Sequence, residues 1–236
     1  MRLLDFAALS LLLFSCSSTP DTNPQPPERS AVPEGINDNF LDPNLDLEVW
    51  KDRWEVESRE VYAAREGLVA ALGLKPGERV ADVGAGTGLY MVPFSESVGS
   101  EGIVYEADIS PRFIEHLEER KSAEGLRNVR VHASTETSLN LPSDSIDAAF
   151  VCDTYHHFEY HKSMLASLRN ALSRGGRLMI VDFERIPGVS REWVMGHVRA
   201  GKEQVRAEIE EAGFAFDREV DLPELEENYC MVFIKP

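Results

Sequence analysis

The stretch VADVGAGTG, residues 80–88, decides the class of fold. It joins a short apolar run that contains the acidic residue Asp82 to a G-x-G-x-G loop. Glycines let the backbone turn tightly and let a ligand approach without clashing with a Cβ atom, and a helix start beyond the loop offers unpaired N–H groups. Asp108 stands 24 residues after Gly84, at the predicted end of the next strand, where a carboxylate can accept both hydroxyls of a ribose. Together these features predict a nucleoside-binding site.

Two other glycine loops do not fit this sequence. A dinucleotide loop reads G-x-G-x-x-G, and Leu89 stands where its third glycine belongs. A Walker loop needs Gly-Lys followed by Ser or Thr, and that pair does not follow the glycines. The loop therefore disfavours a nicotinamide-dependent oxidoreductase and excludes a P-loop nucleotidase.

Outward from the loop, short apolar runs alternate with segments of helical periodicity. The predicted strands are 79–83, 102–107, 129–133, 146–152, 177–182, 214–221 and 229–235, and the predicted helices are 88–98, 111–124, 160–173 and 202–212. Strands that alternate with helices predict an α/β, Rossmann-like doubly wound fold with a mostly parallel, seven-stranded sheet. The last two strands lack an intervening helix, so we expect them to pair antiparallel.

Local signals divide the chain further. Residues 37–76 show helical periodicity and end at a Pro-Gly break, which predicts a helical cover before a domain at 77–236. Ser110-Pro111 is a typical helix start, and Arg174-Gly175-Gly176 is expected to end a helix.

Four stretches carry a family resemblance: VADVGAGTG (80–88), ADIS (107–110), LPSDSIDAAFVCDTYHHF (141–158) and LRNALSRGGRLMIVDF (168–183). With them the sequence resembles the class I S-adenosylmethionine-dependent methyltransferases, in particular the small-molecule and quinone-methylase-like branch. The resemblance continues through 196–214 to the terminal strand. It implies S-adenosylmethionine as cofactor and a small molecule as methyl acceptor.

The resemblance also implies roles for individual residues. Asp82 and the backbone of the loop would hold the methionine moiety, Asp108 would bind the ribose, and Ile109 would pack on the adenine. The loop residues are Gly84, Ala85, Gly86 and Gly88. Ser134 occupies the position where the family often has an acid that meets the adenine amino group, and Thr135 or Glu136 could replace that contact. Asp153 would face the methionine end and the acceptor.

A polar cluster follows the fourth predicted strand, at the sheet edge where ligands of open α/β folds lie. We expect Asp153, His156 and His157 to act on the acceptor, one of them as general base. Two alternatives remain: a metal site built on His157 and His161 at i, i+4 spacing, or a purely structural role in which His161 is a surface residue. No resident metal is expected.

Other residues are candidates for the rim of the site. Trp54, Arg59 and Tyr62 precede the first strand and could cover the cofactor. His197 and Arg199, before the last long helix, could reach the pocket.

The amino terminus reads as an export signal. Residues 1–15 have a basic start and an apolar stretch typical of a signal peptide, and Leu13-Phe14-Ser15-Cys16 resembles a bacterial lipobox with Cys16 as the lipidated residue. Residues 16–36 are rich in Pro and Ser, which indicates a tether. We expect a lipid-anchored protein of the bacterial cell envelope, or a cytoplasmic one if the signal prediction is wrong.

Composition limits the partners. The chain of 236 residues has 24 Lys+Arg against 41 Asp+Glu, a net charge of −17, which argues against nucleic acid and leaves the lipidated terminus as the only membrane contact. The leading hypothesis is an enzyme that methylates a small molecule. The alternative is an exported cofactor-binding or interaction module that kept the fold and lost turnover.

Overall fold

The computed structural model describes residues 28–236. The predicted signal peptide, Cys16 and most of the predicted tether lie outside the described residues. The described chain folds around one sheet of seven strands in the order β3-β2-β1-β4-β5-β7-β6. The strands are β1 Arg79–Val83, β2 Ile103–Asp108, β3 Val129–Ala133, β4 Ile146–Cys152, β5 Leu172–Phe183, β6 Ala215–Glu219 and β7 Asn228–Ile234.

The strand pairing confirms the predicted topology. The pairs β1–β2, β1–β4, β2–β3 and β4–β5 are parallel, whereas β7 pairs antiparallel with both β5 and β6. The chain runs from β1 outward to β3 and then crosses back to β4 beside β1. That reversal places the carboxyl ends of β1 and β4 at the topological switch point, where open α/β sheets bind ligands.

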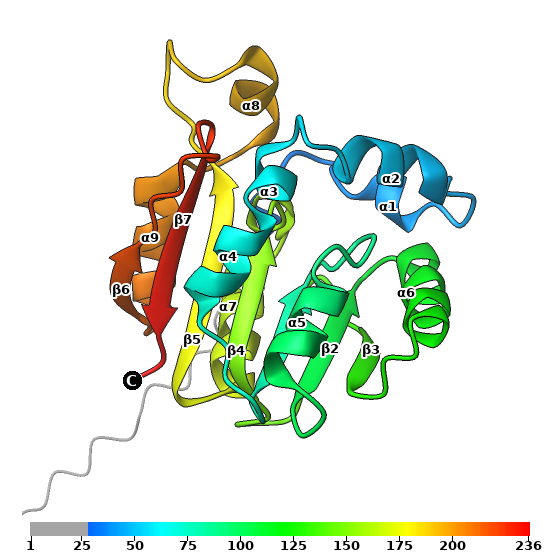
Figure 1. The fold of residues 1–236 in the computed structure, drawn as a ribbon. Coiled ribbons are helices and arrows are strands. Elements are labelled where there is room, and N and C mark those ends of the chain that lie inside the picture. Colours follow the sequence, from blue (N-terminus) through cyan, green and yellow to red (C-terminus); the bar gives the residue numbers. More distant parts are fainter. Residues whose placement is uncertain (1–27) are drawn as a thin grey trace, which may run out of the picture.

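Helices cover both faces of the sheet (Figure 1). The helices are α1 Asp38–Leu41, α2 Leu47–Trp54, α3 Glu60–Ala63, α4 Arg65–Leu72, α5 Met91–Val98, α6 Pro111–Ala123, α7 His161–Ala171, α8 Glu192–His197 and α9 Lys202–Glu211, with a 3₁₀ turn at Tyr155–His157. One buried cluster joins a face of the sheet to α4, α5 and α6, with Leu68, Phe94 and Leu117 at its centre. A second joins the other face to α7 and α9 through Leu165 and Ile209. The result is a three-layer α/β/α sandwich.

The expected cover over 37–76 is four short helices, α1 to α4. Figure 1 shows α1 and α2 beyond the upper end of the sheet, on the same side as α8. The cover and α8 therefore frame the carboxyl ends of β1 and β4.

Several predicted boundaries were wrong. The helix after the glycine loop begins at Met91 rather than at 88, because the loop needs those residues for its turns. The predicted stop at Arg174-Gly175-Gly176 lies inside β5, since α7 already ends at Ala171 and the chain turns directly into an extended strand. Ser110 was predicted correctly as a cap, and its side chain accepts the N–H of Phe113.

Within residues 28–236 we find no helix with the length and apolar character that crossing a bilayer requires.

Candidate active site

The glycine loop makes a close approach to the end of β4. Gly84 follows β1 with φ +75°, and a Cβ atom there would lie 2.3 Å from Thr154 Cγ2. Gly86 has φ +55°, and a Cβ atom there would lie 2.9 Å from the Trp54 ring. Both positions need glycine for two reasons, because an L side chain would be strained by the backbone angle and would also collide with a neighbour.

Asp108, at the end of β2, anchors this loop. The Gly86 N–H donates to Asp108 Oδ2 at 2.9 Å, and the Ser110 N–H donates to Oδ1 at 2.8 Å. Burial raises the pKa of Asp108, while the backbone N–H bonds lower it. Each carboxylate oxygen can accept a further hydrogen bond, so Asp108 can hold the loop and bind two hydroxyls at once.

A cavity opens between the loop and the end of β3; we call it the loop cavity. Most of the predicted cofactor residues meet here, although they come from four strand ends. Its lining includes Gly84, Gly86, Asp108, Ile109, Ser134, Thr135, Glu136 and Asp153, with the Trp54 and Phe113 rings. Gly88 does not line it: a Cβ atom there would lie 2.8 Å from Leu117, so this glycine serves the packing of α6.

A smaller cavity, the inner cavity, lies behind the loop and is lined by Asp82, Ala85 and Tyr90. Asp82 pairs in register with Glu106 of β2, and both carboxyl groups are buried. Among residues 28–236 no hydrogen-bond partner meets Asp82 Oδ2 or either Glu106 oxygen. Glu106 was not among the predicted site residues. The sequence feature that could have pointed to it is its place as an acidic residue in the middle of an apolar strand.

These buried acids make stability depend on pH. Burial, with the charge of Asp108, raises the pKa of Asp82 from 3.8 to about 8. The folded state therefore binds a proton that the unfolded state has lost between about pH 4 and pH 8, so the free energy of unfolding should fall as pH rises through this window. The slope is roughly 1.4 kcal/mol per pH unit while Asp82 alone titrates.

Asp82→Asn should reduce this slope in the cofactor-free protein. We expect chemical denaturation between pH 7 and pH 8.5 to show stability falling less steeply in the variant than in the natural protein, because burial also raises the pKa of Glu106, which the variant keeps. Asp221→Asn, at an exposed position, is the matched control and should keep the slope. Equal slopes in all three proteins would contradict the assignment.

Asp153 lies where the cavities meet, and it contacts both faces of the site. It has φ +47°, and its side chain is 6% exposed. Its Oδ2 accepts from Arg59 at 2.7 Å and its Oδ1 accepts from Asn228 at 2.7 Å. Through these two bonds Asp153 joins the cover to β7. Arg59 and Trp54 do lie at the site as expected, whereas Tyr62 lies outside the lining of the cavities.

The predicted polar cluster divides into two groups. Tyr155 donates to Glu208 Oε2 at 2.8 Å on the α9 side, and Arg199 forms an ion pair with the same carboxylate at 2.7 Å. His161 is buried near Glu28 and Glu208, so its prediction as a surface residue was wrong. His157 and His161 have different partners, since His157 contacts Asn37 whereas His161 lies near Glu28 and Glu208, and the two are not grouped as metal ligands among residues 28–236.

The other group faces the opposite way. The His156 Nδ1 lies 2.7 Å from Asp182 Oδ1, and the His157 Nδ1 lies 3.0 Å from Asn37 Oδ1. His197 of α8 joins them, with ring centroids 5.3 Å and 5.2 Å away. Burial lowers the pKa of His157 to about 2, and the neighbouring His156 and His197 add to this shift. Burial alone would lower the pKa of His156, but the charge of Asp182 raises it.

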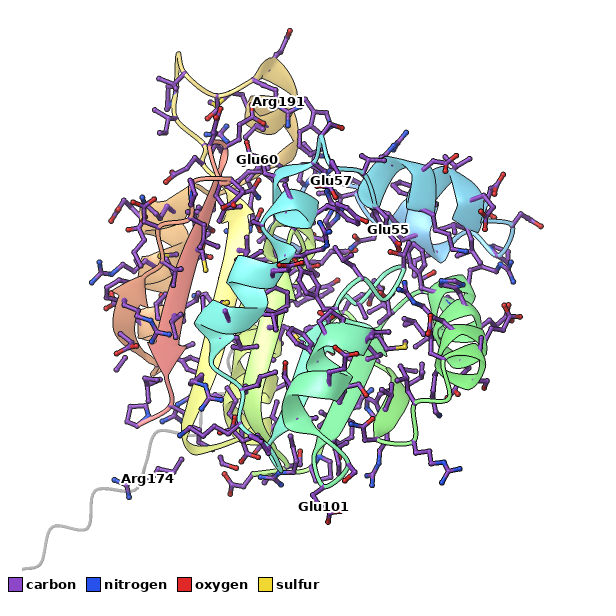
Figure 2. The ribbon with its side chains drawn as sticks, in the orientation of Figure 1. Glu55, Glu57, Glu60, Glu101, Arg174 and Arg191 are labelled. Carbon is purple, nitrogen blue, oxygen red and sulfur yellow. The ribbon has the colours of Figure 1, made fainter. Side chains whose placement is uncertain are left out.

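These histidines line an open cleft of about 910 Å³. The cleft lies between the cover and α8 and shares Trp54, Asp153 and His157 with the loop cavity. Its walls carry aromatic rings and arginines: Phe40, Trp50, Phe183, Trp193, Arg53 and Arg191. Figure 2 places Arg191 and Glu60 at this end of the molecule, and Arg174 and Glu101 at the opposite end.

Comparison with known proteins identifies the central part of the chain. Residues 81–180 match the family model described as a methyltransferase domain. These residues are therefore similar to a methyltransferase domain. A structure of a SAM-dependent methyltransferase from Aquifex aeolicus superposes with a TM-score of 0.71 at 25% identity, covering 81% of this chain and 99% of that one. The fold is the Rossmann-like methyltransferase fold, and the Aquifex aeolicus protein is described as SAM-dependent.

Two curated relatives are similar over the same region. The ubiquinone/menaquinone biosynthesis C-methyltransferase UbiE of Marinomonas sp. (strain MWYL1) is 30% identical over 50% of this chain and 47% of its own. The aklanonic acid methyltransferase DauC of Streptomyces sp. (strain C5) is 32% identical over 43% of this chain and 46% of its own. The chain thus spans about half the length of the curated relatives it matches.

The site residues fit the cofactor of a methyltransferase domain. The loop glycines leave the backbone open to the loop cavity, and Asp108 keeps lone pairs for the ribose hydroxyls. The orphaned Asp82 Oδ2 lies beside the inner cavity, where a cationic amine would supply its missing partner. The loop cavity, with Asp108, would take the adenosine part of the cofactor. The inner cavity, with Asp82, would take its methionine part.

Proposed function

We propose that the chain transfers a methyl group from S-adenosylmethionine to a small-molecule acceptor bound in the open cleft. The observation that carries this proposal is the junction at Asp153 and His157. There the loop cavity, which fits the cofactor, opens into a cleft large enough for a second molecule.

The protein contributes orientation and exclusion of water. The cofactor supplies a methyl carbon already attached to a positively charged sulfur, so the reaction is an in-line displacement that depends on alignment. Asp108 and the glycine loop fix the adenosine end. Trp54 lies against Gly86, and Arg59 ties the cover to Asp153, so these two side chains close the cofactor off from solvent on the cover side.

The cleft favours a flat, partly anionic acceptor. Five Phe and Trp side chains line its walls, and aromatic surfaces bind planar apolar molecules well. Arg53 and Arg191 are exposed at the cleft; Arg191 pairs with Glu227 at 2.8 Å, which leaves Arg53 to pair with an acidic oxygen of the acceptor. The quinone and polyketide substrates named for the relatives are consistent with an aromatic, oxygenated acceptor of this kind.

A direct assay tests the proposal. The protein is incubated with S-adenosylmethionine and a panel of phenols, quinols and polyketide aromatics, and both S-adenosylhomocysteine and the methylated product are followed by mass spectrometry. We expect one product per cofactor consumed. Tight cofactor binding without a product from any acceptor would favour the alternative of a binding module that lost turnover.

We also propose that the protein is anchored to a bacterial envelope membrane through Cys16. The support is the sequence Leu13-Phe14-Ser15-Cys16 followed by a Pro/Ser-rich tether. In a bacterial host, Cys16→Ala should move the protein from the membrane fraction to the soluble fraction or leave its signal unprocessed, whereas Ser17→Ala should change neither. A membrane fraction that is the same with and without Cys16 would remove the anchor.

A further inference from the structure

We infer that His156, His157 and His197 form a binding site for a divalent transition metal such as Zn²⁺, at the wall of the open cleft. Each residue offers one ring nitrogen, and the three nitrogens lie within 4.8 Å of one another. Two of the histidines come from the turn after β4, and the third comes from α8, far along the chain. Metal binding goes beyond methyl transfer and does not require it.

The hydrogen bonds of the rings favour this reading. His156 uses Nδ1 for Asp182, and His157 uses Nδ1 for Asn37, so each keeps its Nε2 free. A metal-binding histidine characteristically places its second nitrogen on a carboxylate or another oxygen, which fixes the tautomer and aims the ligand atom. Asp182 is itself buried and also accepts the backbone N–H of His156, so its orientation is fixed.

The surroundings hold the third ligand in place. The His197 ring stacks on Trp193 with centroids 4.7 Å apart and 22° between planes, and Phe183 packs edge-on against both Trp193 and His156. Bonds of about 2.0–2.1 Å to a tetrahedral metal place ligand nitrogens roughly 3.4 Å apart. On metal binding the ligand nitrogens must therefore approach one another by at most about 1.4 Å, the difference between 4.8 Å and 3.4 Å.

The coordination would remain open toward the cleft. Asp153 lines the same cleft, but its two oxygens already accept from Arg59 and Asn228, and it is not part of the group of close ligand atoms. Three histidines with one open position is the arrangement of catalytic rather than structural zinc sites. A general base would require only one of these histidines, whereas a bound metal would explain why three ring nitrogens lie close together.

The open coordination position of the metal suggests a role in methyl transfer, and this role rests on the proposed function. A hydroxyl or carbonyl oxygen of the acceptor would bind the metal, and the metal would lower the pKa of that hydroxyl and fix its oxygen relative to the methyl group. The acceptor's proton then leaves to solvent through the open cleft, and no redox step is involved.

Calorimetry on tag-free full-length protein, stripped with a chelator and free of cofactor, tests the site. Titration with ZnCl₂ should show one equivalent bound per chain, and titration with CoCl₂ should give the visible bands of tetrahedral cobalt. His197→Ala and His157→Gln should each weaken binding at least tenfold, since each removes one of three ligands. His132→Ala, in the edge strand β3, is the matched control and should bind as the natural protein does.

Circular dichroism on each variant keeps the result interpretable if one fails to fold; His197 is only half-buried, so its variant should be folded. No saturable binding to the natural protein, or binding unchanged by His197→Ala, would overturn the inference. Calorimetry with S-adenosylhomocysteine on the natural protein and on His197→Ala separates this outcome from a failure of the proposed function, because His197 does not line the loop cavity that fits the cofactor.

Discussion

Gly84→Ala is expected to abolish cofactor binding and to lower the free energy of unfolding by roughly 2–5 kcal/mol. The alanine Cβ would lie 2.3 Å from Thr154 Cγ2, and the backbone at φ +75° would be strained as well. Relief of the clash must move Thr154 or the loop, and both line the loop cavity. Chemical denaturation measures the stability, and calorimetry with S-adenosylhomocysteine measures the binding.

Gly73→Ala is the matched control, because it introduces backbone strain at a positive φ without a collision of the new Cβ atom. Gly73 ends α4 in the left-handed conformation, at φ +64°, and the nearest atom to its Cβ position is 4.0 Å away. Its alanine variant should lose only about 1–2 kcal/mol and bind the cofactor normally. If Gly84→Ala were no more damaging than Gly73→Ala, the close approach of the loop to β4 would not matter for the site.

Asp108→Ala is expected to weaken cofactor binding by roughly 10²–10⁴-fold, because each hydrogen bond from a ribose hydroxyl to this carboxylate contributes about 1.5–3 kcal/mol. The variant also loses the acceptor for the Gly86 and Ser110 N–H groups, so its stability must be measured separately. Calorimetry at a temperature where the variant is folded gives the affinity.

A modified ligand isolates the ribose contact. The natural protein should bind S-adenosylhomocysteine much more tightly than its 2′-deoxy analogue, and Asp108→Ala should bind the two alike. Glu101→Ala, at the opposite end of the molecule, removes the same charge and should keep the discrimination (Figure 2). An unchanged preference in Asp108→Ala would place the ribose elsewhere.

The parts of the fold that sequence predicted are those fixed by local patterns. Strand β1, the glycine loop and Asp108 follow from short-range requirements on backbone shape and burial, and the structure brings them together as expected. Ser134, Thr135 and Glu136 line the loop cavity because β3 ends beside β2, which the parallel topology already implied.

The parts that sequence did not predict depend on contacts between distant segments. The pairing of Arg59 with Asp153, and of His156 with Asp182, joins positions that no periodicity relates. The divergence of His157 and His161 depends on a 3₁₀ turn, where the expected helical spacing fails. Helix α8 itself was not predicted, because six residues are too short to give a periodic signal, although its His197 was a candidate for the rim of the site and does line the cleft.

Calorimetric titration of the natural protein with S-adenosylmethionine and S-adenosylhomocysteine tests the central claim most directly, because both ligands must occupy the loop cavity and the inner cavity. We predict one site per chain with an affinity in the micromolar range for both ligands, and no comparable binding of NAD. The absence of binding by either ligand at millimolar concentration, or tight binding of NAD in their place, would contradict the account.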